Sequence, residues 1–300
     1  ALQTRCHRRV GGFPAPRAGL KRYCVVRVVA SQQTLQPPSV VITGASSGIG
    51  RQSALLMASK GWHVFAGVRK PSDGEALQQA AAAQAPTNTN TGGSITPVII
   101  DVTKPDTITS AAQKVHAVLS VSGQSQGLTG LVNNAGKVTL APLEHMPIEV
   151  FEDQINVNLT GVLRVTQAFL PLMREGLQPP GSTGQADGEE EDEEDVGGPA
   201  KHPKTRRIVN ISSQSGTVAL PLFGGYSASK FALEAVSDCL RYELDGQGFD
   251  VVCLKPGAVK SDIWSRAHVA SSSVLDALPP SVKATYGALI EQVDRAAKKA

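Results

Sequence analysis

Long apolar runs, metal-binding spacings and paired cysteine motifs are all missing from this 300-residue sequence. No stretch approaches the roughly 18 consecutive apolar residues that a membrane-spanning helix needs, so we expect no membrane span. The six histidines show no metal-ligand spacing, and we expect no metal. The four cysteines form neither a Cys-x-x-Cys pair nor a Cys/His cluster, which favours reduced thiols over disulfides.

Acidic residues are missing from the beginning of the chain. No acidic residue precedes Asp73, whereas residues 1–37 contain seven Lys and Arg residues. An Arg-rich, acid-free start without a long apolar core is typical of an organelle transit peptide. We therefore interpret residues 1–37 as a transit peptide or disordered leader. Residues 25–31 resemble a plastid processing site, so the plastid is the expected location and the mitochondrion the alternative.

The remainder of the chain carries a small net negative charge once the seven leader cations are set aside, which argues against nucleic-acid binding. The sequence also has no initiator methionine, and we expect it to be part of a longer translation product.

From Val40 onward, short β-branched runs alternate with longer helical patterns. This alternation is typical of repeated β-α units around a parallel sheet. The expected strands cover residues 40–43, 63–68, 96–100, 130–132, 207–211 and 250–254, and the expected helices cover 49–60, 73–85, 106–121, 148–175 and 225–246. We predict a single α/β domain over residues 38–300, with the doubly wound parallel sheet of a Rossmann fold.

One segment, residues 177–204, interrupts this alternation. Its first part is rich in Gly, Pro and Ser, and Glu189–Asp195 are seven consecutive acids. Repulsion between like charges and the lack of apolar residues predict a disordered surface insertion. A docking role for this acidic insertion is the alternative.

A glycine-rich loop, Thr43–Gly50, follows the first expected strand and opens the first expected helix. Glycines in this position let the backbone approach a pyrophosphate, which the helix N-terminus then stabilises. The spacing Thr-Gly-x-x-x-Gly-x-Gly resembles that of the short-chain dehydrogenase/reductase family, as do Asn133–Gly136 and the pair Asp101-Val102; the resemblance covers roughly residues 38–265. It implies that the nicotinamide cofactor is bound by Thr43, Gly44, Ser46, Ser47, Gly48, Ile49, Gly50, Asp101, Val102, Asn134, Ala135 and Gly136.

The choice of cofactor depends on the end of the second expected strand. A carboxylate there would bind the ribose hydroxyls of NAD and repel the additional phosphate of NADP. The sequence instead has Arg69 and Lys70, and a guanidinium group can clamp a 2′-phosphate. Many NADP-dependent members of the family carry a basic residue at the position of Ser47, which this chain lacks. NADP(H) is nevertheless favoured over NAD(H).

The proposed catalytic residues begin with Tyr226 and Lys230, which lie four residues apart and therefore on one face of a helix. A nearby ammonium group favours a phenolate, so we expect Lys230 to lower the pKa of Tyr226 and make it an acid or base near neutral pH. By resemblance to the family, Ser213 is the catalytic serine, with Ser212 as its competitor, and Asn158 helps to hold a water chain to the lysine.

Other expected cofactor contacts come from Tyr226 and Lys230 themselves and, by resemblance, from Pro256, Gly257, Val259 and Ser261 after the sixth strand. Residues 262–300 are expected to form a substrate lid, in which Ile263 and Trp264 suggest a bulky or lipophilic substrate; plain helix packing is the alternative. The family's usual seventh strand has no counterpart before Ala300. The resemblance also implies a homodimer or homotetramer built from helices 148–175 and 225–246.

Together these features predict an NADP(H)-dependent oxidoreductase that moves a hydride between nicotinamide and a small alcohol or carbonyl compound, with steroid- or retinoid-like compounds as one class. The alternative is a catalytically inactive NAD(P)-binding sensor or scaffold. The set Asn158, Ser213, Tyr226 and Lys230 argues against it, because binding alone does not require all four.

Overall fold

The computed structural model describes residues 37–84, 93–121, 127–177, 206–257, 259 and 262–297. The predictions for the leader, for the acidic insertion and for Ser261 therefore lie outside the described residues, apart from Pro37 and Leu177 at the margins of these segments.

Six parallel strands form one sheet in the order β3-β2-β1-β4-β5-β6. Their bounds are β1 Ser39–Ile42, β2 His63–Val68, β3 Ser94–Ile99, β4 Gly130–Asn133, β5 Arg206–Ile211 and β6 Phe249–Leu254. In the register of the sheet, Val41 of the central strand pairs with Phe65 on one side and Leu131 on the other. The strand order reverses between β1 and β4, which confirms the predicted doubly wound sheet.

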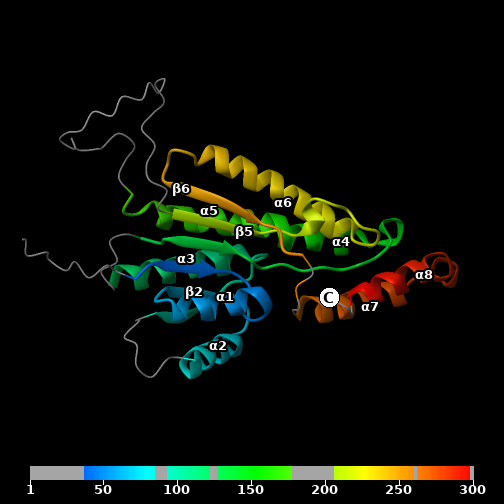
Figure 1. Ribbon diagram of the computed structural model, residues 1–300, viewed down its shortest axis with the longest axis horizontal. Coiled ribbons are helices and arrows are strands. Elements are labelled where there is room, and N and C mark those ends of the chain that lie inside the picture. The colour runs from blue at the N-terminus through cyan, green and yellow to red at the C-terminus, as the bar shows by residue number, and fades with distance from the viewer. Residues whose placement is uncertain are drawn as a thin grey trace, which may run out of the picture. The chain divides into compact units, whose positions relative to one another are not determined.

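Alternating residues along the strands form two separate cores. Val41 and Phe65 belong to a cluster with the helices that follow β3 and β4, whereas Val40 and Val64 belong to a cluster with the helices that follow β1 and β2. Successive side chains in a strand point to opposite faces, so helices cover both faces of the sheet (Figure 1). Both faces are buried, which explains why the strands are continuous apolar runs.

The helices are α1 Gly48–Ser59, α2 Pro71–Gln84, α3 Pro105–Val121, α4 Ile148–Ile155, α5 Gly161–Arg174, α6 Gly224–Glu243, α7 Asp262–Asp276 and α8 Pro280–Ala297. The helix predicted over 148–175 is interrupted by a π-helical turn, η2 Asn156–Thr160. This turn widens the helix where the buried Asn158 side chain binds a neighbouring loop. None of the described helices is long and apolar enough to cross a membrane.

The predicted lid is a pair of helices, α7 and α8, which lie beyond the carboxyl ends of the strands (Figure 1). Within residues 262–297 the structure has no strand, and the described part of the sheet ends at β6. Helix α7 is held by the Leu140 amide, which donates a 2.8 Å hydrogen bond to the Ser271 hydroxyl. Buried Ala267 packs with Val138 and Phe223. These contacts place one face of α7 over the loops at the carboxyl edge of the sheet.

Candidate active site

A cavity of about 1140 Å³ opens at the carboxyl edge of the sheet, and the loops that follow all six strands line it. Ligands of doubly wound sheets bind at this edge, and the volume exceeds the roughly 300–1,000 Å³ typical of sites for one small molecule. Of the predicted site residues, those on its wall are Gly44, Ser46, Ser47, Gly48, Ile49, Arg69, Asp101, Val102, Asn134, Ala135, Gly136, Ser213, Tyr226, Lys230, Pro256, Gly257 and Val259. Three others, Thr43, Gly50 and Asn158, are not among the lining residues.

Thr43 and Gly50 position the glycine loop from behind. The Thr43 hydroxyl accepts hydrogen bonds of 3.0 Å from the amides of Asn134 and Ala135. The Asn134 side-chain amide donates in turn to the carbonyl oxygens of Thr43, at 2.9 Å, and Gly44, at 3.1 Å. A Cβ atom on Gly50 would lie only 2.4 Å from that amide nitrogen, so only glycine fits there. The loop after β4 thus holds the loop after β1.

The start of α1 has the features of an anion-binding site. Ser47 occupies the N-cap position without a side-chain capping bond, and the first turn of the helix has no acidic residue. Gly44 and Gly48 have φ angles of +64° and +53°, a left-handed conformation that favours glycine. Backbone amides and the positive end of the helix dipole therefore face the cavity. The loop fits the pyrophosphate of a dinucleotide.

The ends of β2 and β3 form another part of the cavity wall. Arg69 lines the cavity directly after β2. Asp101 accepts hydrogen bonds from the Thr103 amide, at 3.0 Å, and the Thr103 hydroxyl, at 2.6 Å. Burial alone would raise the pKa of Asp101, but these bonds and the charges of Lys104 and Arg69 lower it below its usual value. Asp101 is therefore a carboxylate at neutral pH and can accept hydrogen bonds from a ligand.

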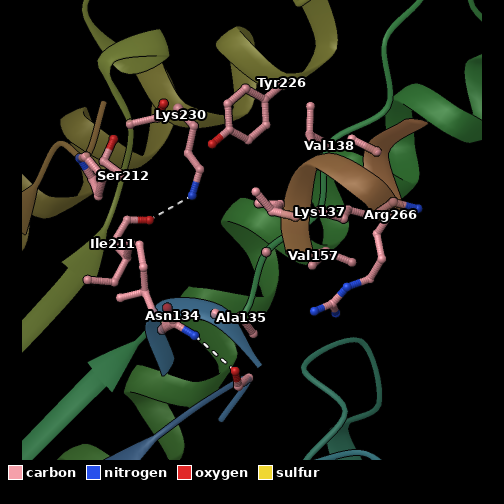
Figure 2. Close-up of a pocket in the computed structure, with 18 of the residues that line it drawn as sticks. Asn134, Ala135, Lys137, Val138, Val157, Ile211, Ser212, Tyr226, Lys230 and Arg266 are labelled. Carbon is pink, nitrogen blue, oxygen red and sulfur yellow. Dashed lines mark hydrogen bonds between the residues drawn. The ribbon is translucent and has the colours of Figure 1, made fainter. Parts of the chain in front are cut away.

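Ser213, Tyr226 and Lys230 meet on the opposite wall. The Lys230 ammonium group donates a 2.7 Å hydrogen bond to the carbonyl oxygen of Ile211, the last residue of β5. Figure 2 shows this amine and the Tyr226 phenol directed into the same space. Ser213 follows β5 by two residues and lines the same cavity, where its hydroxyl accepts a 3.1 Å hydrogen bond from the Ser215 amide. The competitor Ser212 is buried, and its hydroxyl has no hydrogen-bond partner among the described residues.

The pKa values of this group differ from the sequence-based expectation. Burial raises the pKa of Tyr226, and the nearby Ser213 hydroxyl opposes the rise only in part. Burial also lowers the pKa of Lys230 to about 8, although Cys253 and Glu234 act in the other direction. The predicted lowering of the phenol pKa by Lys230 is therefore wrong for this structure. Its ammonium group lies 5.8 Å from the centre of the Tyr226 ring and is bonded to Ile211 instead.

Asn158 lies behind the cavity wall, where its side chain is fully buried in the π-helical turn. Its side-chain oxygen accepts a 2.9 Å hydrogen bond from the Lys137 amide, and its nitrogen donates to the Lys137 carbonyl and the Ser229 hydroxyl at 2.9 and 3.0 Å. The side chain thus joins the loop after β4 to α6. Gly136 lies in the same contact, where an added Cβ atom would be 3.4 Å from the Asn158 oxygen and 3.9 Å from the Lys230 amine.

Several charged residues of the cavity were not predicted from the sequence. Lys137 forms an ion pair with Asp153, and Lys255 forms one with Glu234 at 3.2 Å. Arg266 of α7 donates a hydrogen bond to the Ser47 hydroxyl. These contacts join residues distant in sequence, so no local pattern indicated them. Across the described ranges, no group of three His, Cys, Asp or Glu residues is arranged to hold a metal ion.

The buried ammonium group makes a testable contribution to stability. The pKa of Lys230 is about 8 in the fold and 10.5 in its ordinary state, so folding disfavours the charged form. Below pH 8 this difference makes the native state about 3 kcal/mol less stable than it would be with an unshifted pKa. Replacing the lysine removes that cost but also loses the hydrogen bond to Ile211, which contributes about 1 kcal/mol. We expect Lys230→Met to raise the free energy of unfolding at pH 7 by about 2 kcal/mol.

Between pH 8 and 10.5 the unfolded state binds more protons than the native state, so the wild-type protein gains stability with pH. The advantage of the variant should therefore shrink by pH 10 in urea unfolding. Lys283→Met, at an exposed position of α8, is the control. A difference between Lys230→Met and wild type that is the same at pH 7 and pH 10 would contradict the assignment.

Comparisons with known proteins agree with this geometry. The sequence matches the short chain dehydrogenase family over residues 38–182 and 200–270. It is 31% identical over 257 residues to the NADPH-dependent 3-dehydrocapnine reductase of Ornithobacterium rhinotracheale, covering 85% of this chain and 75% of the relative. It is also 31% identical to estradiol 17-beta-dehydrogenase 2 of Mus musculus, over 88% of this chain but only 61% of that protein.

A solved structure from Beutenbergia cavernae, with bound NADP at low occupancy, matches with a TM-score of 0.59 and 25% identity over 82% of this chain and 83% of the other. The match to the family spans well over half of the sequence. The chain therefore belongs to the short-chain dehydrogenase family of oxidoreductases, which act on CH–OH groups with a nicotinamide cofactor.

Proposed function

We propose that this protein is an NADP(H)-dependent oxidoreductase that interconverts an alcohol and a carbonyl compound with an apolar body. The observation that carries the proposal is the shared cavity. Ser213, Tyr226 and Lys230 lie on its wall together with the glycine loop and Arg69. A binding protein would need the glycine loop but not the three polar groups opposite it.

In this proposal the protein supplies the proton and the electrostatic stabilisation, and the bound nicotinamide supplies or accepts the hydride. The Tyr226 hydroxyl gives its proton to the carbonyl oxygen during reduction. Ser213 donates a hydrogen bond to the same oxygen and stabilises the negative charge that develops there. Because burial raises the pKa of Tyr226, the phenol is protonated at neutral pH, which suits reduction. Lys230, with a pKa of about 8, can hold a proton close to the phenol.

The preference for NADP(H) rests on the end of β2. Arg69 lines the cavity there, where a carboxylate would repel a 2′-phosphate. The name of one relative, an NADPH-dependent reductase, and the NADP bound in one structural neighbour support the same choice.

Replacing Arg69 with Asp tests this preference. The new carboxylate removes a cation and repels the 2′-phosphate, so affinity for NADPH should fall at least tenfold, while affinity for NADH changes by less than threefold. Calorimetric titration of both cofactors measures the two effects. Arg69→Gln serves as the comparison, because it removes the cation without adding repulsion. An equal loss for both cofactors in the Asp variant would refute the assignment.

The substrate side of the cavity is apolar. Val138, Phe223 and Ala267 form a buried cluster against which Tyr226 and Ile263 pack. Val218 and Leu220 also line the cavity and are 59% and 51% exposed, so apolar surface continues to its mouth. These residues support a substrate with a lipophilic body. The name of the estradiol dehydrogenase among the relatives agrees with that class.

Replacing Tyr226 with Phe tests the reaction itself. The variant should bind NADPH within about twofold of wild type and lose turnover by roughly 100- to 10,000-fold, because only the transferable proton is removed. A panel of aliphatic and steroid-like ketones, followed by nicotinamide absorbance, supplies the assay. The matched control is Tyr242→Phe on the exposed face of the same helix, where the side chain is 78% exposed. Turnover that survives in Tyr226→Phe would sink the mechanism.

Two further expectations stay predictions. Leu163 of α5 and Phe231 of α6 are partly exposed apolar residues, 37% and 44% respectively, and they support association of copies through these helices. The plastid location depends on residues 1–37, as does its mitochondrial alternative.

A further inference from the structure

Helix α7 presents one cation to the cavity. Four of its residues, Ile263, Arg266, Ala267 and Ala270, line the wall. They follow the spacing of three, four and seven residues that defines one helix face. The other three are apolar, so Arg266 is the single charged residue of this stripe. A guanidinium group on an otherwise apolar face suggests a specific partner within the cavity.

That guanidinium group extends from α7 into the pocket (Figure 2). Its Nη2 atom donates a hydrogen bond to the hydroxyl of Ser47, a residue 219 positions earlier in the chain. Ser47 is the N-cap of α1, and its hydroxyl makes no capping bond there. The lid helix therefore reaches the start of α1 with a positive charge.

The glycine loop and the end of β2 share one end of the cavity. The Ala45 amide donates a 2.9 Å hydrogen bond to the carbonyl oxygen of Gly67, so the loop crosses the end of β2. Arg69 follows Gly67 by two residues, and Ser47 follows Ala45 by two; both line the cavity. Arg69 and Arg266, which come from distant parts of the chain, therefore both line this end of the cavity.

The three lysines on the cavity wall have partners within the protein. Lys137 pairs with Asp153, Lys255 pairs with Glu234, and Lys230 donates to Ile211. Arg69 and Arg266 both line the cavity close to the glycine loop, and Arg266 donates a hydrogen bond to the Ser47 hydroxyl of that loop. A phosphate monoester carries between one and two negative charges near neutral pH, and guanidinium groups bind it with charge-assisted hydrogen bonds.

We propose that Arg266 of α7 is a second ligand for the 2′-phosphate of NADP(H). It would place a positive charge beside the glycine loop, which has serine at position 47. This inference rests on the proposed preference for NADP(H). It adds that the phosphate holds α7 in place, so the substrate-facing residues Ile263 and Ala267 are ordered by the cofactor that carries the phosphate.

The test is calorimetric binding of NADP⁺ and NAD⁺ to the full chain carrying Arg266→Gln. Loss of one charge-assisted contact at an exposed residue should weaken NADP⁺ binding about tenfold, while NAD⁺ binding changes by less than twofold. Arg295→Gln on α8 is the matched control and should leave both affinities unchanged, because Arg295 bonds only locally to the Glu291 carbonyl among the contacts described.

A second variant places the charge on the loop instead of the lid. Adding Ser47→Arg to Arg266→Gln should restore most of the lost NADP⁺ affinity. Unchanged NADP⁺ affinity in Arg266→Gln, an equal loss for both dinucleotides, or no recovery in the double variant would each overturn the inference. A wild-type protein that binds both dinucleotides equally would instead refute the cofactor preference. If wild type prefers NADP⁺ and Arg266→Gln keeps that preference in full, only the role of Arg266 is refuted and the cofactor preference stands.

Discussion

The Lys230 ammonium group donates a 2.7 Å hydrogen bond to the carbonyl oxygen of Ile211, and the geometry of the catalytic wall depends on this contact. Ile211 ends β5 and Lys230 lies in the second turn of α6, so the bond sets how the helix lies against the strand end. Ser213 and Tyr226, which lie close to the two bonded residues in sequence, are thereby brought to the wall of the same cavity. Burial disfavours the charged form of this lysine and lowers its pKa to about 8, so the bond to Ile211 holds an ammonium group that is costly to bury.

A short segment after β4 connects this wall to the cofactor side. Asn134 at its start braces the glycine loop, and Lys137 at its end is held through its backbone by Asn158. Between them, Gly136 lies beside the Lys230 amine, which would be 3.9 Å from a Cβ atom at this position. Four consecutive residues therefore fix the distance between the dinucleotide loop and the proposed proton donor. Asn158 contributes by holding this segment, which explains why a residue that does not line the cavity belongs to the site.

Much of this arrangement could be predicted from the sequence, because its signals are local. Strands buried on both faces appear as continuous apolar runs, and β2 was predicted with its observed bounds. The glycine loop and the Tyr226–Lys230 pair are also short patterns. The π-helical turn was missed because it depends on a contact between Asn158 and Lys137. The direction of the Tyr226 pKa was missed because burial is a property of the folded chain.

The role of α7 was also invisible in the sequence, since Arg266 meets Ser47 across 219 residues. The resemblance to the family led us to expect a lid over residues 262–300, but it did not indicate the arginine that α7 directs toward the glycine loop. The fold thus converts a loop without a basic residue into one with an arginine beside it.

The most direct test of the central claim is a crystal structure of the protein with bound NADP⁺. We expect electron density for the nicotinamide ring at the wall of Ser213, Tyr226 and Lys230, and for the adenosine phosphate beside Arg69. Density for the ring at the other end of the cavity, or side chains at these three positions turned away from it, would contradict the account.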